Sequence, residues 1–155
     1  MCAVGLVAKP AAHGRRQSHH RQPQDRHRPR RRGISGFAIE DVKLSDIYVQ
    51  HVGGAAADST KIQVPEDETK YPEPGMFGPT PSGGFFLRHM KNLEVSHAEI
   101  QPVAADPRAS FYLEDVHRAD FVAVTAPSTP PVFSFNNSSD VRIRISRAAP
   151  DSTTP

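Results

Sequence analysis

The sequence has little of several residue types that define common protein classes. Its single cysteine, Cys2, excludes an internal disulfide framework and a cysteine-rich zinc module. It has no tryptophan, and its 15 prolines outnumber its 10 glycines. A proline-rich chain with short apolar runs favours strands and loops over helices. The 155 residues are still enough for one domain with a core of its own.

Long hydrophobic runs are also missing. No apolar run reaches the roughly 18 residues needed to cross a membrane, so we expect no membrane partner. The N-terminal run CAVGLVA has no basic residue before it and is short for a signal peptide. We therefore expect that it is not a signal, and the sequence assigns no cellular location.

Charge is distributed very unevenly along the chain. Residues 14–32 contain eight arginines and one aspartate, whereas residues 33–155 contain ten basic and sixteen acidic residues. The net charge of +2 therefore combines a segment of +7 with a body of −6, the remaining unit coming from a single lysine near the N-terminus. The body of the protein is mildly acidic.

Residues 1–33 show no apolar period and are predicted to be disordered, because they cannot bury enough surface to offset their ordering entropy. Three interpretations stay open. The arginines alone permit binding to nucleic acid, although no aromatic residues interleave with them to stack on bases. The histidines lack the cysteines or acidic cluster that would fix a metal site, so no metal is expected. The segment could also be a non-native leader joined to the true reading frame near Gly33.

The body of the chain repeats. GFFLRHMKNLEV, SFYLEDVHRADF and VFSFNNSSDVRI align at offsets of 26 (85 to 111) and 22 (111 to 133) residues. IEDVKLSDIYVQ is a fourth copy, offset by 51 from KNLEVSHAEIQ. The aligned columns include Phe85, Phe111 and Phe133; Leu87, Leu113 and Phe135; Val42 and Leu93; Leu44 and Val95; and the polar His89, Asp115 and Asn137. A period of this length is typical of stacked supersecondary units.

The repeat predicts an all-β fold, a parallel β-helix of about four coils over residues 34–146. Each coil would lie about 4.8 Å above the last. Opposite charges would then be neighbours one coil apart, as Arg88 with Glu114 and Lys43 with Glu94. Residues 53–83, rich in glycine and proline, are predicted to form a long loop, and residues 147–155 a frayed tail. A Greek-key sandwich is the alternative, but it does not require inward columns at this period.

The polar column of His89, Asp115 and Asn137 falls between strand patterns. Asn and Asp suit the left-handed backbone of a tight corner, which favours a role in the bend. A His–carboxylate pair could also perform acid–base chemistry. We favour the corner.

A family resemblance rests on IEDVKLSDIYVQHVGG and on YPEPGMFGPTPSGGFFLRHMKNLEV. These segments resemble the C-terminal coils of bacterial members of glycoside hydrolase family 28, the polygalacturonase-like enzymes. The resemblance covers about residues 34–146 and implies a right-handed parallel β-helix of the pectin-lyase-like type. It also implies an inverting hydrolase of pectic poly- or oligosaccharides, from a family whose members are usually secreted or periplasmic, with no cofactor.

The catalytic motifs of that family are absent from this sequence. It has no Asn-Thr-Asp, no adjacent Asp pair and no Gly-His-Gly. The Arg-Ile-Lys motif of the family precedes these coils, whereas the superficially similar Arg142-Ile143-Arg144 of this sequence comes at their end. We therefore assign no catalytic residue. The resemblance does imply that Tyr71, Arg88 and His89 could contact an acidic sugar, Arg88 through a bidentate carboxylate pair. The alternative is that Tyr71 is packed and Arg88 pairs with Glu114.

Three functions follow from these observations. The chain is expected to be a C-terminal fragment of a polygalacturonase-like hydrolase, inactive alone. It could instead be a carbohydrate-binding or structural β-helix module. The third hypothesis is a nucleic-acid binder that uses the basic arm.

Overall fold

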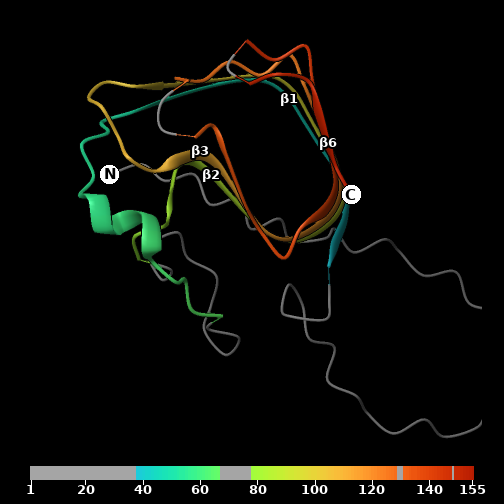
Figure 1. Cartoon of the computed structure of the whole chain (residues 1–155), viewed down its shortest axis with the longest axis horizontal. Coiled ribbons are helices and arrows are strands. Elements are labelled where there is room, and N and C mark those ends of the chain that lie inside the picture. The colour runs from blue at the N-terminus through green and yellow to red at the C-terminus, as the bar shows by residue number, and fades with distance from the viewer. Residues whose placement is uncertain (1–37, 67–77, 129–130, 148) are drawn as a thin grey trace, which may run out of the picture.

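The structure is a computed structural model that describes residues 38–66, 78–128, 131–147 and 149–155 (Figure 1). The expected leader, residues 1–33, lies outside the described residues. Among the residues described, no helix is long and apolar enough to cross a membrane.

The described chain is all-β, as predicted. Its elements are β1 Ile39–His51, the short 3-10 helix η1 Ala57–Lys61, β2 Ser82–Pro102, β3 Ala109–Val122, β4 Phe133–Asn136, β5 Ser139–Arg144 and β6 Ser152–Thr154. They form one mixed sheet in the order β1-β2-β3-β5-β6, and β4 pairs with β3 beside β5. In Figure 1 the long strands follow one another around a common bent outline.

The strands pair in parallel, in the register that the repeat predicts. Val42 lies opposite Leu93, and Leu44 lies opposite Val95. The other aligned columns also pair: Phe85 with Phe111, Leu87 with Leu113, Phe111 with Phe133 and Leu113 with Phe135. Of the strands in the described ranges, only β6 runs antiparallel, against β5. Register is strongly specified here because a slip of one residue would turn every inward side chain to the outside.

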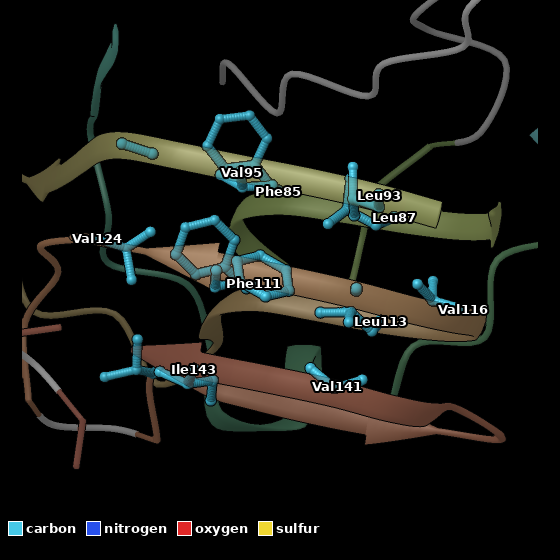
Figure 2. Close-up of a cluster of buried hydrophobic side chains, with 14 of the residues drawn as sticks. Phe85, Leu87, Leu93, Val95, Phe111, Leu113, Val116, Val124, Val141 and Ile143 are labelled. Carbon is cyan, nitrogen blue, oxygen red and sulfur yellow. The ribbon is translucent and has the colours of Figure 1, made fainter. Parts of the chain in front are cut away.

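The core is a stack of like residues contributed by successive strands. Phe111 is fully buried, and its ring stacks on Phe85 at 5.4 Å and on Phe133 at 5.0 Å between centroids. The ring of Phe121 meets that of Phe111 edge-on at 5.3 Å. Figure 2 shows the ribbons of β2, β3 and β5 one below another, with Phe85, Phe111 and Ile143 in successive layers. Burying each such side chain contributes roughly 1.5–3 kcal/mol.

The strands bend at residues with a left-handed backbone. All the described non-glycine residues with positive φ fall into three columns: His89, Asp115 and Asn137; Asp41, Asn92, Arg118 and Asp140; and Asp46, His97, Ala123 and Ile145. Their φ angles lie between 48° and 61°. The corner role predicted for the column of His89 is therefore confirmed, and two further columns share it.

Two boundaries differ from the prediction. The described part of the loop at 53–83 contains η1, and β2 begins inside that range, at Ser82. Residues 147–155 were expected to be a frayed tail, but Thr153 and Thr154 of β6 pair with Arg142 and Val141 of β5. The exposed edge of β5 supplies backbone partners that the short segment could not find locally.

Candidate functional site

The side chains of interest gather where residues 52–66, which we call the strap, lie against the outer face of β2 and β3. Arg88 and His89, two of the predicted binding residues, are adjacent in β2 beneath the end of the strap. The third, Tyr71, lies outside the described residues. The strap runs on from β1 and carries η1, and the contacts of Val64, Pro65 and Glu66 with Arg88 and His89 bring its end to β2.

Arg88 is held by the protein on several sides. Its Nη2 lies 3.0 Å from Glu114 Oε1, and its Nη1 lies 3.5 Å from Glu66 Oε1. The guanidinium also donates to the backbone carbonyls of Val64 and Pro65. The guanidinium carbon of Arg88, Cζ, lies 5.1 Å from the centre of the Phe86 ring. The pairing with Glu114, which the sequence offered as the alternative to sugar binding, is present, and it leaves Arg88 few donors for a ligand.

His89 lies between two carboxylates. Its Nδ1 is 2.6 Å from Asp115 Oδ2, and its Nε2 is 3.1 Å from both oxygens of Glu66. The side chain is 7% exposed. Both ring nitrogens can donate at once only when the ring carries both protons, as an imidazolium. His89 therefore ties the strap to β3.

Asp115 is the centre of a longer hydrogen-bonded chain. Besides His89, it accepts hydrogen bonds from His117 Nε2 at 3.1 Å and Asn137 Nδ2 at 3.1 Å. His117 Nδ1 lies 2.8 Å from Ser139 Oγ. The hydrogen bond from His89, with that from His117, holds the pKa of the Asp115 carboxyl below its usual value, although burial opposes the shift. The chain thus runs from the strap through β2 and β3 to β5.

An open hollow of about 370 Å³ lies between the strap and the outer face of the sheet. Its lining is mixed in charge and comprises Thr60, Lys61, Ile62, Gln63, Val64, Glu66, Arg88, Tyr112, Glu114 and Asn136. Three of these, Arg88, Glu114 and Asn136, occupy one column across β2, β3 and β4. Burial, together with the charge of Glu114, raises the pKa of the Tyr112 hydroxyl, which therefore stays a neutral donor at the hollow.

Among the described residues that line it, the hollow offers groups for binding and no free acid–base pair. Glu66 and Glu114 both border it, but both are bonded to Arg88. His89, paired with Asp115 as the acid–base hypothesis required, has both nitrogens engaged. Within the described ranges, no group of three or more His, Cys, Asp or Glu side chains is placed to hold a metal ion.

Sequence reasoning missed Glu66 and Tyr112. Glu66 belongs to a segment without a period, and nothing in its surroundings indicates which strand it will meet. Tyr112 is an outward position of a strand whose inward neighbours, Phe111 and Leu113, carried the signal. The alternation could have placed Tyr112 on the outer face, but not beneath the strap.

Comparisons with protein-family models, with curated proteins and with solved structures found no match to this chain.

Proposed function

We propose that this chain forms the last coils, about four in number, of a right-handed parallel β-helix of the polygalacturonase-like type. The support is the pairing of strands at offsets of 51, 26 and 22 residues and the three stacked columns of bends. A solenoid requires both features, because every coil must repeat the path of the one before it. The parent activity would be the hydrolysis of α-linked galacturonic acid in pectic polysaccharide.

The observation that carries the proposal is the open side of β1. Val42, Leu44 and Ile47 are only partly buried, whereas their partners Leu93, Val95 and Ala98 in β2 are each 1% exposed. The inward side chains of β1 thus belong to the core, but among the described residues no further strand packs over their other side. A preceding coil of the same design would cover this face, and the coils with the catalytic motifs precede these in the family that the sequence resembles.

The proposal predicts that the chain alone hydrolyses nothing. Inverting hydrolysis needs a free general acid and a free general base, roughly 6.5–9.5 Å apart across the sugar. The two carboxylates at the hollow, Glu66 and Glu114, are instead neutralised by Arg88. The test is release of reducing ends from polygalacturonate, with a competent pectinase as the positive control. Release by this chain that disappears in Glu114→Gln would overturn the proposal.

The hollow favours a second candidate, a carbohydrate-binding module. Tyr112 supplies an aromatic surface, Lys61 is exposed, and Asn136 and Gln63 supply amides. An acidic sugar would pair with Lys61, and a charge-assisted hydrogen bond of ~1.5–3 kcal/mol corresponds to about tenfold or more in affinity. Titration calorimetry with oligogalacturonides should show binding that weakens in Lys61→Ala and in Tyr112→Ala. Tyr48→Ala, an exposed tyrosine on β1, is the matched control. Absence of binding by the parent chain would end this candidate.

The basic arm lies outside the described residues, so nucleic-acid binding stays a prediction. It requires salt-dependent retention on DNA that is lost when residues 1–33 are removed. Retention by the truncated chain would refute it.

A further inference from the structure

We propose that Ser139 is an activated nucleophile, an acylation site at which His117 removes the hydroxyl proton and Asp115 positions the His117 ring. The proposal rests on one continuous line of contacts on the outer face of β3 and β5. Ser139 Oγ lies 2.8 Å from His117 Nδ1, and the other ring nitrogen, Nε2, lies 3.1 Å from Asp115 Oδ1. A hydroxyl, an imidazole and a carboxylate in this order are the arrangement that activates serine nucleophiles on unrelated folds.

The parallel pairing of β3 and β5 places the two reacting side chains together. His117 and Ser139 lie directly opposite one another in the register, each two residues after the bend at Asp115 or Asn137. The inward neighbour of His117, Val116, is fully buried, so alternation turns His117 outward, where 46% of its side chain is exposed. An electrophile in solution therefore reaches this pair without passing through the core.

Asp115 determines which nitrogen of His117 carries the proton. Its Oδ2 lies 2.6 Å from His89 Nδ1, and its Oδ1 also accepts from Asn137 Nδ2 at 3.1 Å, so both oxygens are held in place. The hydrogen bonds from His89 and His117 hold the pKa of the Asp115 carboxyl below its usual value, so the group is an ionised acceptor. The neutral His117 ring then has its one N–H on Nε2, toward Asp115. Its lone pair on Nδ1 faces the Ser139 hydroxyl, as a general base requires.

The step transfers an acyl group from a carboxylic ester with a good leaving group, such as an aryl ester. Ser139 Oγ forms a bond to the carbonyl carbon, and its proton passes to His117 Nδ1. The carbon–oxygen bond of the ester breaks, and the departing phenolate takes that proton, which leaves an acyl-serine and a phenol. The backbone N–H of Val116 is already bonded to Ser138 Oγ at 3.1 Å and is not free to stabilise an oxyanion. We therefore assign acylation by reactive esters alone, independently of the hollow and of glycosidic bonds.

The test is incubation of the full chain with para-nitrophenyl acetate at pH 8.5, above the range of about pH 5 to 8 in which imidazoles titrate. The tryptic peptide 119–142 contains Ser139 and no lysine, and mass spectrometry locates the acetyl group within it. Ser138 is the internal control, because its hydroxyl donates to the carbonyl of Asn136 at 3.0 Å and not to a ring nitrogen. General-base assistance contributes roughly 10²–10⁴ in rate, so Ser139 should be acetylated about a hundredfold faster than Ser138. Equal rates would overturn the proposal.

A variant of the base separates activation from mere exposure of the serine. His117→Asn should lower the acetylation of Ser139 to the rate of Ser138. His97→Asn is the matched control and should leave that rate unchanged. His97 is also an exposed histidine near a carboxylate, that of Asp46 at 3.9 Å, but among the described residues no hydrogen bond joins it to a serine. Acetylation of Ser139 that persists unchanged in His117→Asn would contradict the proposal.

The positioning role of Asp115 is tested by the place of the ring proton. Nitrogen-15 magnetic resonance of the His117 ring at pH 8.5 should show the Nε2–H tautomer in the parent chain. Asp115→Asn should populate the Nδ1–H form and slow the acetylation of Ser139, and asparagine tolerates the φ of 54° at this position. A parent ring protonated at Nδ1 would overturn the proposal without reference to any variant. An acetylation rate that is unchanged in Asp115→Asn would show that the carboxylate does not position the base.

Discussion

The bends of this fold are made by single residues in a left-handed conformation. For most side chains that conformation costs roughly 1–2 kcal/mol, and Asn and Asp tolerate it best. Asp46 and His97 begin one column, but Ala123 and the β-branched Ile145 continue it with φ of 54° and 55°. The backbone N–H of Ile145 is held by Asp151 at 2.7 Å. In the later strands, therefore, the neighbouring layers impose the bend on residues that do not favour it.

At the same scale, a buried ion pair sets a dependence on acid. The side chain of Asp106 is 3% exposed, and its oxygens accept hydrogen bonds from Arg108 Nε at 2.9 Å and Nη2 at 2.7 Å. Arg108 holds the pKa of the Asp106 carboxyl below its usual value, against the opposing effect of burial. A lowered pKa in the folded state means that the pair stabilises the fold above the unfolded pKa, near 4, and loses this contribution as the pH falls through the folded value.

We therefore expect Asp106→Asn to flatten the acid side of the stability profile. The variant keeps an oxygen for the backbone N–H of Arg108 but loses the charge that titrates. The measurement is the urea midpoint between pH 6 and pH 2, where the parent should lose stability more steeply than the variant. The exposed Asp58→Asn is the control and should follow the parent. Parallel profiles for the parent and Asp106→Asn would contradict this account.

At the scale of elements, β2 is the strand on which the others are built. It pairs with β1 on one side and with β3 on the other, and it carries residues of all three bend columns. The backbone at the start of β2 passes very close to β3. A Cβ added to Gly84 would lie 2.6 Å from the carbonyl oxygen of Ser110 and 2.7 Å from Cδ1 of Ile100. Glycine is needed at this position because two backbones approach closely, not because of its φ.

Gly84→Ala should therefore destabilise the protein. Overpacking of this kind costs about 1–3 kcal/mol, and the clash with backbone at Ser110 leaves little room to relax. The free energy of unfolding from urea titration measures the effect. Gly83→Ala is the neighbouring control, because its added Cβ would lie 3.3 Å from the His51 ring and 3.7 Å from the carbonyl oxygen of Arg108, with no contact as short as those at Gly84. Equal losses for the two variants would show that close approach is not the reason for Gly84.

At the scale of the whole molecule, the two ends of the sheet differ. At the C-terminal end β6 covers β5, and Val141 and Ile143 are 1% and 5% exposed. At the other end, among the described residues, β1 is an edge strand whose inward side chains, such as Leu44, are only partly buried. An uncovered edge with apolar side chains is a template for pairing with another chain. Association should therefore occur at β1.

We expect Leu44→Lys to reduce self-association. A lysine at this position places a charge where a second chain would have to pack. Sedimentation velocity over a range of concentrations should show a smaller associated fraction for the variant than for the parent. Ile145→Lys is the control, because Ile145 is 73% exposed but lies at the end covered by β6. An equal reduction in both variants would place the contact elsewhere.

The repeat columns were predictable because their information is local and periodic. Phe85, Phe111 and Phe133 recur at one position of three copies, and their alternation with Leu87, Leu113 and Phe135 assigns them to one face. The column of His89 was predictable from turn chemistry. The bends at Ala123 and Ile145 were not predictable, since neither residue type has a preference that marks it for this conformation.

The sequence by itself determined the all-β class, the register of the strands and the neighbouring positions of Arg88 and Glu114, because each follows from period and spacing. Only the tertiary structure decided where the strap lies, that Glu66 meets His89, and that residues 152–154 form a strand. These contacts join segments without a period to surfaces that exist only after the strands have stacked. These contacts are stabilised by carboxylates, ring nitrogens and strand edges that only folding brings together, so no local sequence pattern predicts them.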